Sequence, residues 1–381
     1  MSFASLASPL ARSQTQAMID RIQDLLPRVT CQLNVLPSPV KAPTKANEVF
    51  VAVSGAEADY LTQVLLQDQA RLVVATASDL MHPLPAGLGF VCIPDRALPF
   101  DAYLNREGLI MDEMEAGCRV GVMSMRSRSQ MTGLWPSLKF EILRGGVDHA
   151  MEIHLHKSEI DGLVLPAAVT EHLGIQGIVA EIFAPDFILP GPGQGTLVIL
   201  GRSNDLEARE LLAELHSADT AVELDTEHAF CRRMISDQDL PVGALARVLG
   251  GEVVITGTTG PGTSRIAVNG ETHEAEAVGS GLADQILSRS ESFADLLEAD
   301  FPDGLPEEND EDVTLLEKFP VEAAAIGEVP PPSDQEDWTD RDEELDELEY
   351  LRRLEDMAGI EKAPAGGDDD DDDLDPFHDE N

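Results

Sequence analysis

Two short apolar runs in this chain each end in a turn that carries an arginine. Residues 119–123 lead into Ser124 and Arg126, and residues 139–143 lead into Arg144. Where parallel strands end, the backbone N–H groups of such turns, and of the helices that follow them, attract negative charge. An arginine beside them can pair with a planar carboxylate through two hydrogen bonds. Together, these three side chains predict a site for a small anion.

Histidines and a glycine-rich segment offer two other kinds of chemistry. His154 and His156 would share a face of an extended segment, and His149 precedes them, but no third ligand completes a metal site. Residues 257–263 look like a phosphate cradle, although no lysine and hydroxyl residue follow. We therefore expect no metal site, and we expect a hairpin turn at 257–263.

The charge of the chain limits its partners. It carries 71 acidic and 26 basic residues among 381, a formal net charge of −45. The last 81 residues alone hold 31 acidic and 5 basic side chains. Because such a surface repels phosphate, no nucleic-acid partner is expected. Acidic metabolites can bind only where arginines gather locally.

Composition favours a folded cytoplasmic protein. Hydrophobic residues make up 43% of the chain, which is enough for two or three domains with real cores. The chain contains no run of eighteen apolar residues, and its first residues lack the pattern of a secretory signal, so no membrane partner is expected. The four cysteines are scattered, which is typical of a reduced compartment. They are Cys31, Cys92, Cys118 and Cys231.

The elements that would position the candidate residues alternate between helix and strand. This alternation is typical of parallel βαβ architecture. The segment at 101–104, which follows Pro99, marks the start of a second domain. The expected helices are 12–26 and 58–67, and the expected strands are 48–53, 71–75, 89–93, 119–123, 139–143 and 162–165.

From residue 205 onward the pattern changes to that of an α+β module. Short glycine-rich turns separate three β-type runs, which predicts an antiparallel meander. The expected helices are 207–216, 226–234 and 282–297, and the expected strands are 244–248, 252–256 and 264–268.

The region beyond about residue 300 is expected to be a disordered acidic tail. The six aspartates at 368–373 are expected to be solvated. Residues 342–357 place four leucines on one helical face, and two interpretations stay open. One is a marginal helix in solvent. The other is a helix that folds when it docks on a protein partner of the tail.

Several weak motifs occur in one consistent order over residues 5–290. They are Ser-Pro-Leu-Ala at 8–11, Asp79 with Leu-Pro-Ala-Gly-Leu at 84–88, Ser124 with Arg126, Arg-Gly at 144–145 with Val-Asp at 147–148, Pro-Gly-Gln-Gly at 192–195, and Glu-His-Ala-Phe-Cys-Arg-Arg at 227–233 with Pro-Val-Gly-Ala at 241–244. In this order they resemble porphobilinogen deaminase (hydroxymethylbilane synthase), the enzyme family that links four pyrroles on the way to haem.

The resemblance implies a transferase of tetrapyrrole biosynthesis with a dipyrromethane cofactor held by a cysteine thioether. It implies Asp79 as the catalytic carboxylate. It also implies a set of residues that bind the acidic pyrrole or another small anion: Ser8, Ser124, Arg126, Arg144 and Gln194. Asp79 has an ordinary alternative role as a helix N-cap. Gln194 has one as part of a hinge in a glycine-rich turn.

The chain departs from the family at the cofactor position. Gln238 stands where the family has the cysteine, and an amide cannot form the thioether. Cys231 lies seven residues upstream and is expected to face a core. No cofactor is therefore expected, and dipyrromethane would be present only if the family chemistry is retained.

The basic residues that would hold the pyrrole carboxylates are also depleted. Each charge-assisted bond is worth about 1.5–3 kcal/mol, so their loss would weaken the binding of a chain with many carboxylates. Arg126 and Arg144 stay in place. The replaced positions are Leu6, Ser54, Ser78, Ser127 and Ala150.

The resemblance implies an α/β fold with two domains like those of periplasmic binding proteins around a cleft. A small α+β C-terminal domain and the tail complete it. The expected boundaries are 1–95 with 180–203 for a discontinuous first domain, 100–178 for the second, 204–298 for the third and 299–381 for the tail.

Two classes of function follow from these residues. The first is a porphobilinogen deaminase-like protein of haem biosynthesis, in which the altered site favours a pseudoenzyme over an active enzyme. The second is a non-catalytic protein that binds a small anion in the two-lobed cleft or acts as an adaptor through its tail. A second homologue in the same genome that keeps the cysteine and the arginines would favour loss of activity here.

Overall fold

The computed structural model describes residues 1–37, 56–80, 83–143, 146–157, 159–234, 241–260, 262 and 264–289. Several predictions lie outside the described residues: the strand at 48–53, Arg144, Gln238, the last part of the helix at 282–297, and the tail with its helix at 342–357.

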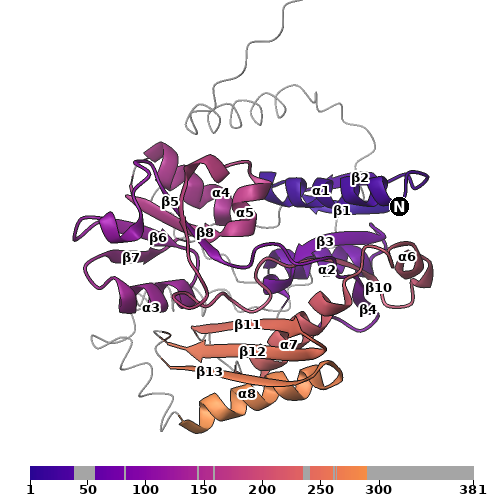
Figure 1. The fold of residues 1–381 in the computed structure, drawn as a ribbon. Coiled ribbons are helices and arrows are strands. Elements are labelled where there is room, and N and C mark those ends of the chain that lie inside the picture. The colour runs from indigo at the N-terminus through magenta and orange to yellow at the C-terminus, as the bar shows by residue number, and fades with distance from the viewer. Residues whose placement is uncertain are drawn as a thin grey trace, which may run out of the picture. The chain divides into compact units, whose positions relative to one another are not determined.

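The first sheet has five strands in the order β2-β1-β3-β10-β4 (Figure 1). Strand β1 pairs in parallel with β2 and β3, whereas β10 runs antiparallel to both β3 and β4. The strands are β1 Ser2–Leu6, β2 Gln32–Leu36, β3 Leu72–Thr76, β4 Leu88–Cys92 and β10 Leu197–Arg202.

Helices cover both faces of this sheet. Because successive side chains of a strand point to opposite faces, Leu72 and Val73 of β3 lie in different cores. Helix α1 (Pro9–Leu25) packs on the face of Leu72, and helix α2 (Ala56–Leu66) packs on the face of Val73. The short helix α6 (Leu206–Leu211) follows β10.

The second sheet also has five strands, in the order β7-β6-β8-β5-β9. Strand β6 is parallel to β7 and β8, and β5 is antiparallel to β8 and β9. The strands are β5 Asp101–Asn105, β6 Arg119–Val122, β7 Lys139–Ile142, β8 Gly162–Pro166 and β9 Val179–Ile182. The helices are α3 Met125–Leu134, α4 Gly146–Met151, a π-helical segment Glu152–Lys157 and α5 Ala167–His172.

The prediction of parallel sheets is wrong for two strands. The α/β class is confirmed, but β5 and β10 make both sheets mixed. Each of these strands follows a segment in which the chain passes from one sheet to the other. The two passing segments lie together, because the N–H of Ala97 donates to the carbonyl of Gly195 over 2.9 Å.

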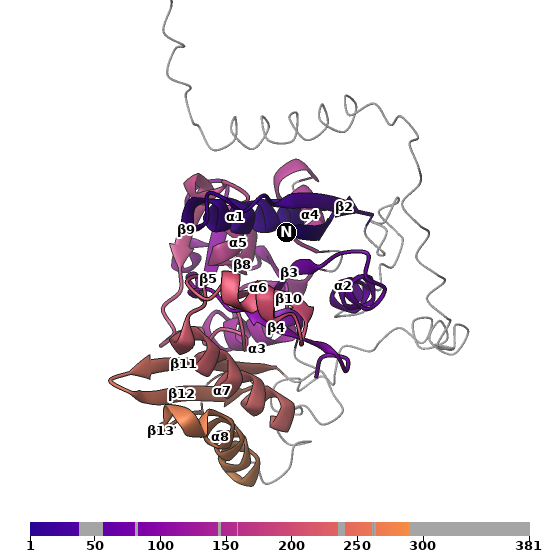
Figure 2. The same ribbon diagram turned by 90° about the vertical axis from the view of Figure 1, so that its right-hand side faces the viewer.

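The third sheet is the predicted antiparallel meander. It consists of β11 (Val242–Leu249), β12 (Glu252–Thr259) and β13 (Arg265–Glu271). Helices α7 (Ala218–Met234) and α8 (Ala275–Arg289) share one core with it (Figure 2). No described helix is long and apolar enough to cross a membrane.

Candidate functional site

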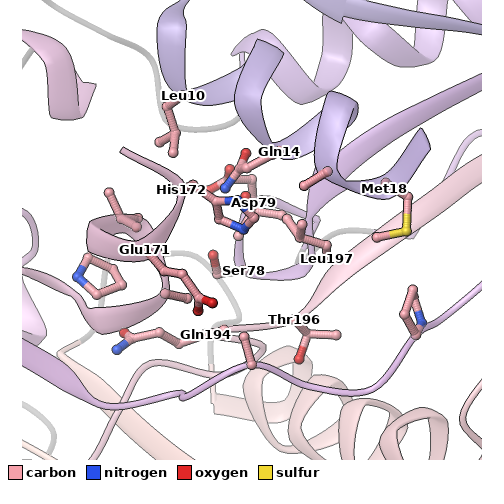
Figure 3. Close-up of a pocket in the computed structure, with 18 of the residues that line it drawn as sticks. Leu10, Gln14, Met18, Ser78, Asp79, Glu171, His172, Gln194, Thr196 and Leu197 are labelled. Carbon is pink, nitrogen blue, oxygen red and sulfur yellow. The ribbon is translucent and has the colours of Figure 1, made fainter. Parts of the chain in front are cut away.

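A pocket of about 340 Å³ lies between helix α1 of the first sheet and helix α5 of the second (Figure 3). The hydroxyl of Ser13 on α1 donates to the carbonyl of His172 on α5 over 2.6 Å, which ties the two helices together. The 3₁₀ turn after β3 (Ala77–Asp79) and the segment 194–197 form further walls. The pocket therefore occupies the place of the predicted cleft.

Apolar atoms form most of the surface of the pocket wall, although apolar and polar residues contribute to it in similar number. The apolar lining residues are Leu10, Ala17, Met18, Pro94, Ala97, Val147, Pro166, Ala168, Val169 and Leu197. The polar and charged ones are Gln14, Arg21, Thr76, Ser78, Asp79, Asp95, Glu171, His172, Gln194 and Thr196. Asp79 and Gln194 are thus the predicted site residues that the structure brings to this pocket.

Asp79 ends the 3₁₀ turn after β3, and its side chain is exposed to the pocket. It caps no described helix. Desolvation raises the pKa of this carboxyl group to about 6, with a further contribution from the charge of Glu57. Within the part of the chain that the structure describes, the Asp79 carboxylate has no hydrogen-bond or ion-pair partner.

Asp148 on α4 has a related environment that the sequence analysis did not identify. It is half-buried, and its Oδ1 has no hydrogen-bond partner among the described atoms. Burial raises the pKa of Asp148 to about 6, and Glu57 adds to the effect. The negative charge of Glu57 raises the pKa of both Asp79 and Asp148, so these carboxyl groups share a region of negative charge.

The other charged side chains of the pocket do not offset the negative charge of Asp79. Arg21 is the one arginine or lysine among the described lining residues, and its guanidinium contacts the carboxylate of Asp95 at 3.1 Å. Burial keeps the pKa of His172 below its usual value, so this imidazole is neutral at pH 7. The described wall is therefore negative.

Ser8 and Ser124 both serve as helix N-caps. The N–H of Ala11 donates to Ser8 Oγ over 3.3 Å at the start of α1. The N–H of Ser127 donates to Ser124 Oγ over 3.1 Å at the start of α3. Neither serine lines the pocket. Their predicted role in anion binding stays a prediction.

Arg126 lies inside the protein, 7% exposed. Its two terminal nitrogens contact the carboxylate of Asp101 at 2.7 and 3.1 Å. They also donate to the carbonyl of Leu189, to Ser127 Oγ and to Gln194 Oε1. A guanidinium with this many protein acceptors is already satisfied.

Gln194 joins this cluster from the segment that leads into β10. Its Nε2 donates to the carbonyl of Pro99 over 2.7 Å and to Asp101 over 3.0 Å. The preceding Gly193 has φ +74°, and a Cβ there would lie 2.9 Å from the backbone nitrogen of Ser78. Only glycine fits this turn. These contacts fix the Gln194 side chain inside the protein, and both its hinge role and its ligand role stay predictions.

A second buried cluster lies next to the first and was missed by the sequence analysis. Glu227 on α7 is fully buried and accepts two hydrogen bonds from Arg96, at 2.6 and 3.1 Å. The same carboxylate accepts from the N–H groups of Gly193 and Ala246. Arg96 in turn donates to the carbonyl of Gln194. Glu227 lies in a stretch of mixed polar and apolar residues, so the sequence carries no signal of its burial.

The cysteines do not fit the attachment of a cofactor in the pocket. None of the four lines it. Cys92 and Cys231 are buried, and burial raises both thiol pKa values to about 12, which opposes formation of the reactive thiolate. Cys231 lies in the core of the third domain, as expected. Cys31 and Cys118 are partly buried beside cores on the two larger sheets.

The histidine segment shows no described ligand set. His154 is fully buried, its two ring nitrogens have no described hydrogen-bond partner, and burial lowers its pKa to about 4. Among described residues, no group of three His, Cys, Asp or Glu side chains could hold a metal ion.

Two mixed α/β sheets with a pocket between their helices, plus a small α+β domain, define a two-lobed class of protein with a third domain. Residues 1–210 match the family described as "Porphobilinogen deaminase, dipyromethane cofactor binding domain". The chain belongs to the porphobilinogen deaminase family.

Curated relatives agree with this family. The chain is 30% identical over 294 residues to the porphobilinogen deaminase of Roseiflexus sp. (strain RS-1), covering 74% of this chain and 94% of the relative. It is 29% identical over 298 residues to that of Roseiflexus castenholzii, covering 75% and 95%.

Matches among solved structures include a periplasmic substrate-binding protein of an ABC transporter from Coxiella burnetii. That match has a TM-score of 0.36 and 9% identity, over 57% of this chain and 92% of the other. A putative methionine-binding lipoprotein from Bacillus subtilis matches with a TM-score of 0.35 and 9% identity, over 57% and 90%.

Proposed function

We propose that this chain is a non-catalytic member of the porphobilinogen deaminase family. The family reaction depends on a cofactor thioether, and Gln238 stands at the position that corresponds to its cysteine. No other thiol supports the attachment, because the two fully buried cysteines lie in cores and none of the four lines the pocket. The protein therefore has the family fold but lacks the cysteine thiol that would carry the cofactor.

The observation that carries the proposal is the position of Arg126. In the family motif this arginine is offered to the carboxylates of the pyrrole. Here it is buried and bound to Asp101 through two hydrogen bonds. Releasing it to a ligand would leave the buried Asp101 carboxylate without its cation, which costs several kcal/mol.

The charge of the pocket supports the same conclusion. A pyrrole with acetate and propionate groups is an anion. The described wall presents Asp79 and Glu171 without a compensating free arginine. Carboxylates on a ligand would face like charges, and such repulsion weakens binding.

The four cysteines are free thiols, which supports the proposed location in the reducing cytoplasm. A protein partner for the acidic tail stays a prediction, because the tail lies outside the described residues.

An intact mass spectrum of the purified full-length protein, before and after incubation with porphobilinogen, tests the proposal. The Roseiflexus sp. relative, treated in parallel, is the positive control. We expect the mass of this chain to stay that of the unmodified polypeptide. A covalent pyrrole adduct on the wild-type chain would overturn the proposal.

The variant Gln238→Cys separates loss of the thiol from loss of the binding site. We expect no adduct on this variant either, because the restored thiol would still lack cations that hold the pyrroles. An adduct on Gln238→Cys alone would show that the pocket still accepts the acidic pyrrole, and that the charge argument is wrong.

A further inference from the structure

Helix α7 packs on two cores and joins the third domain to the first sheet. Its residues Phe230 and Met234 lie in the core of the third domain. Leu224 lies in a core of the first sheet, together with Ala77 and Leu80 from the turn after β3. The turn that forms one wall of the pocket therefore rests on a helix of the third domain.

His228 belongs to this contact. It follows Leu224 by four residues, and residues i and i+4 of a helix share a face. It is 4% exposed, and the centroid of its ring lies 6.3 Å from that of Phe90 on β4. The ring donates a hydrogen bond to the carbonyl of Ala77, whereas its Nε2 is buried without a partner among the described residues.

A positive charge on this imidazole is unfavourable in its surroundings. Arg232 of the same helix repels it, and Glu227, which attracts it, already accepts hydrogen bonds from other groups. The turn contributes Asp79, whose side chain lines the pocket, and β4 contributes the uncharged ring of Phe90. Burial is the largest effect and lowers the pKa of His228 to about 4, so the ring is neutral at pH 7.

A proton therefore binds more tightly to His228 when α7 leaves the turn. The pKa of a histidine in water is near 6.5, whereas that of the buried ring is about 4. A histidine with a lowered pKa supports the contact fully above pH 6.5, and this support is lost as the pH falls toward 4. Between pH 7.5 and pH 5, the difference raises the equilibrium constant for release about 30-fold.

We propose that a proton on His228 controls the contact between α7 and the turn at residues 77–80. The neutral ring holds the turn against the third domain. The charged ring releases it, because the new Nε2–H has no acceptor in the buried contact. Release loosens the pocket wall that carries Ser78 and Asp79, so the geometry of the pocket depends on pH (Figure 3). This inference goes beyond the proposed function, since it holds whether or not the chain has lost the family reaction.

Hydrogen–deuterium exchange of the full-length protein at pH 7.5 and pH 5 tests the proposal. The N–H of Ala77 donates to the carbonyl of Thr196, and that of Leu80 to the carbonyl of Ala77, so a peptide with both reports on the turn. Strand β8 is the internal reference, because it lies in the second sheet. After correction for intrinsic rates, we expect the protection of the turn relative to that of β8 to fall about 30-fold at pH 5.

The variants His228→Gln and His228→Met remove the titratable ring, and the glutamine keeps an N–H donor near Ala77. In both, we expect the protection of the turn to change less than about threefold between the two pH values. His273→Gln is the matched control, because His273 is exposed and precedes α8, and it should respond like the wild type. Circular dichroism checks that the variants fold.

Unchanged protection of the turn in the wild type at pH 5, or an equal loss in the wild type and both His228 variants, would overturn the proposal. An NMR titration of the wild-type histidines gives a second result that needs no variant. A native His228 that titrates near pH 6.5 would also overturn it. None of these measurements involves porphobilinogen, so their failure and that of the proposed function are distinguishable.

Discussion

At the scale of single residues, the neighbours of a charged group decide its role here. Arg126 and Asp79 both match family motifs. Arg126 is paired inside the protein, whereas Asp79 faces a pocket and has no partner among the residues that the structure describes. The sequence motif shows that residue 126 is an arginine, but it does not show that Asp101, 25 residues away in β5, is its partner. Roles inferred from a motif therefore need the environment of the side chain.

The substitution Arg126→Met should destabilise the protein by about 3–5 kcal/mol, because it leaves the buried Asp101 without its cation. The double variant Arg126→Met with Asp101→Leu should recover much of this loss, since it removes both charges. Urea unfolding of the two variants and the wild type measures the difference. A loss below about 1 kcal/mol for Arg126→Met would mean that the pair does not hold this part of the fold.

Asp148→Asn should stabilise the protein at neutral pH. Burial raises the pKa of Asp148 from 3.8 to about 6, so its ionisation opposes folding. The gain should be about 1 kcal/mol above pH 6, after allowance for partial exposure. It should shrink as the pH falls from 6 to 4, where the native carboxyl group is protonated.

Urea unfolding at pH 7.5 and pH 4 measures this gain, with the exposed Asp24→Asn as the control that should change little. A loss of stability for Asp148→Asn at pH 7.5 would show that the ionised carboxylate has a favourable partner.

At the scale of elements, the sequence predicts the fold class and most helices and strands within a few residues. It misses the strands β1, β2, β5, β9 and β10, and it begins α7 and α8 several residues late. It also begins α1 three residues late although Ser8 and Pro9 are a standard helix start. The expected parallel architecture does not foresee the antiparallel strands β5 and β10. Strand direction depends on where the chain re-enters the sheet, and hydrophobic periodicity carries no information on that.

The packing of α7 against α8 depends on Gly279. A Cβ at this position would lie 2.1 Å from the carbonyl oxygen of Thr226, so the helices would have to move apart. We expect Gly279→Ala to cost about 2–3 kcal/mol, the range of overpacked sites. Gly281→Ala on the same helix meets no atom within 4 Å and should gain up to about 1 kcal/mol from helix propensity.

Thermal unfolding of the two alanine variants provides the comparison. Equal stability of the Gly279 and Gly281 variants would contradict the close approach of the two helices.

At the scale of the whole molecule, two buried clusters connect the parts of the chain. Arg126, Asp101 and Gln194 join the second sheet to the passing segments. Glu227 and Arg96 join those segments to the third domain. The Glu227 carboxylate accepts a hydrogen bond from the N–H of Gly193, and the side chain of the next residue, Gln194, belongs to the first cluster. The two clusters are therefore continuous.

The net charge of −45 should make the stability of the whole chain depend on salt. Like charges repel one another in the compact state, and salt screens this repulsion. We expect the Tm to rise when NaCl increases from 50 to 500 mM, roughly over the range in which the Debye length falls below 10 Å. A fall in Tm would show that surface ion pairs outweigh the repulsion.

Consumption of porphobilinogen by the purified full-length protein tests whether this chain has lost the family reaction. The porphobilinogen deaminase of Roseiflexus sp. (strain RS-1), assayed at the same concentration, provides the reference rate. We expect this chain to leave porphobilinogen unchanged while the relative consumes it. Turnover by this chain at a rate comparable to that of the relative would show that the protein is an active enzyme and that another group replaces the missing cysteine.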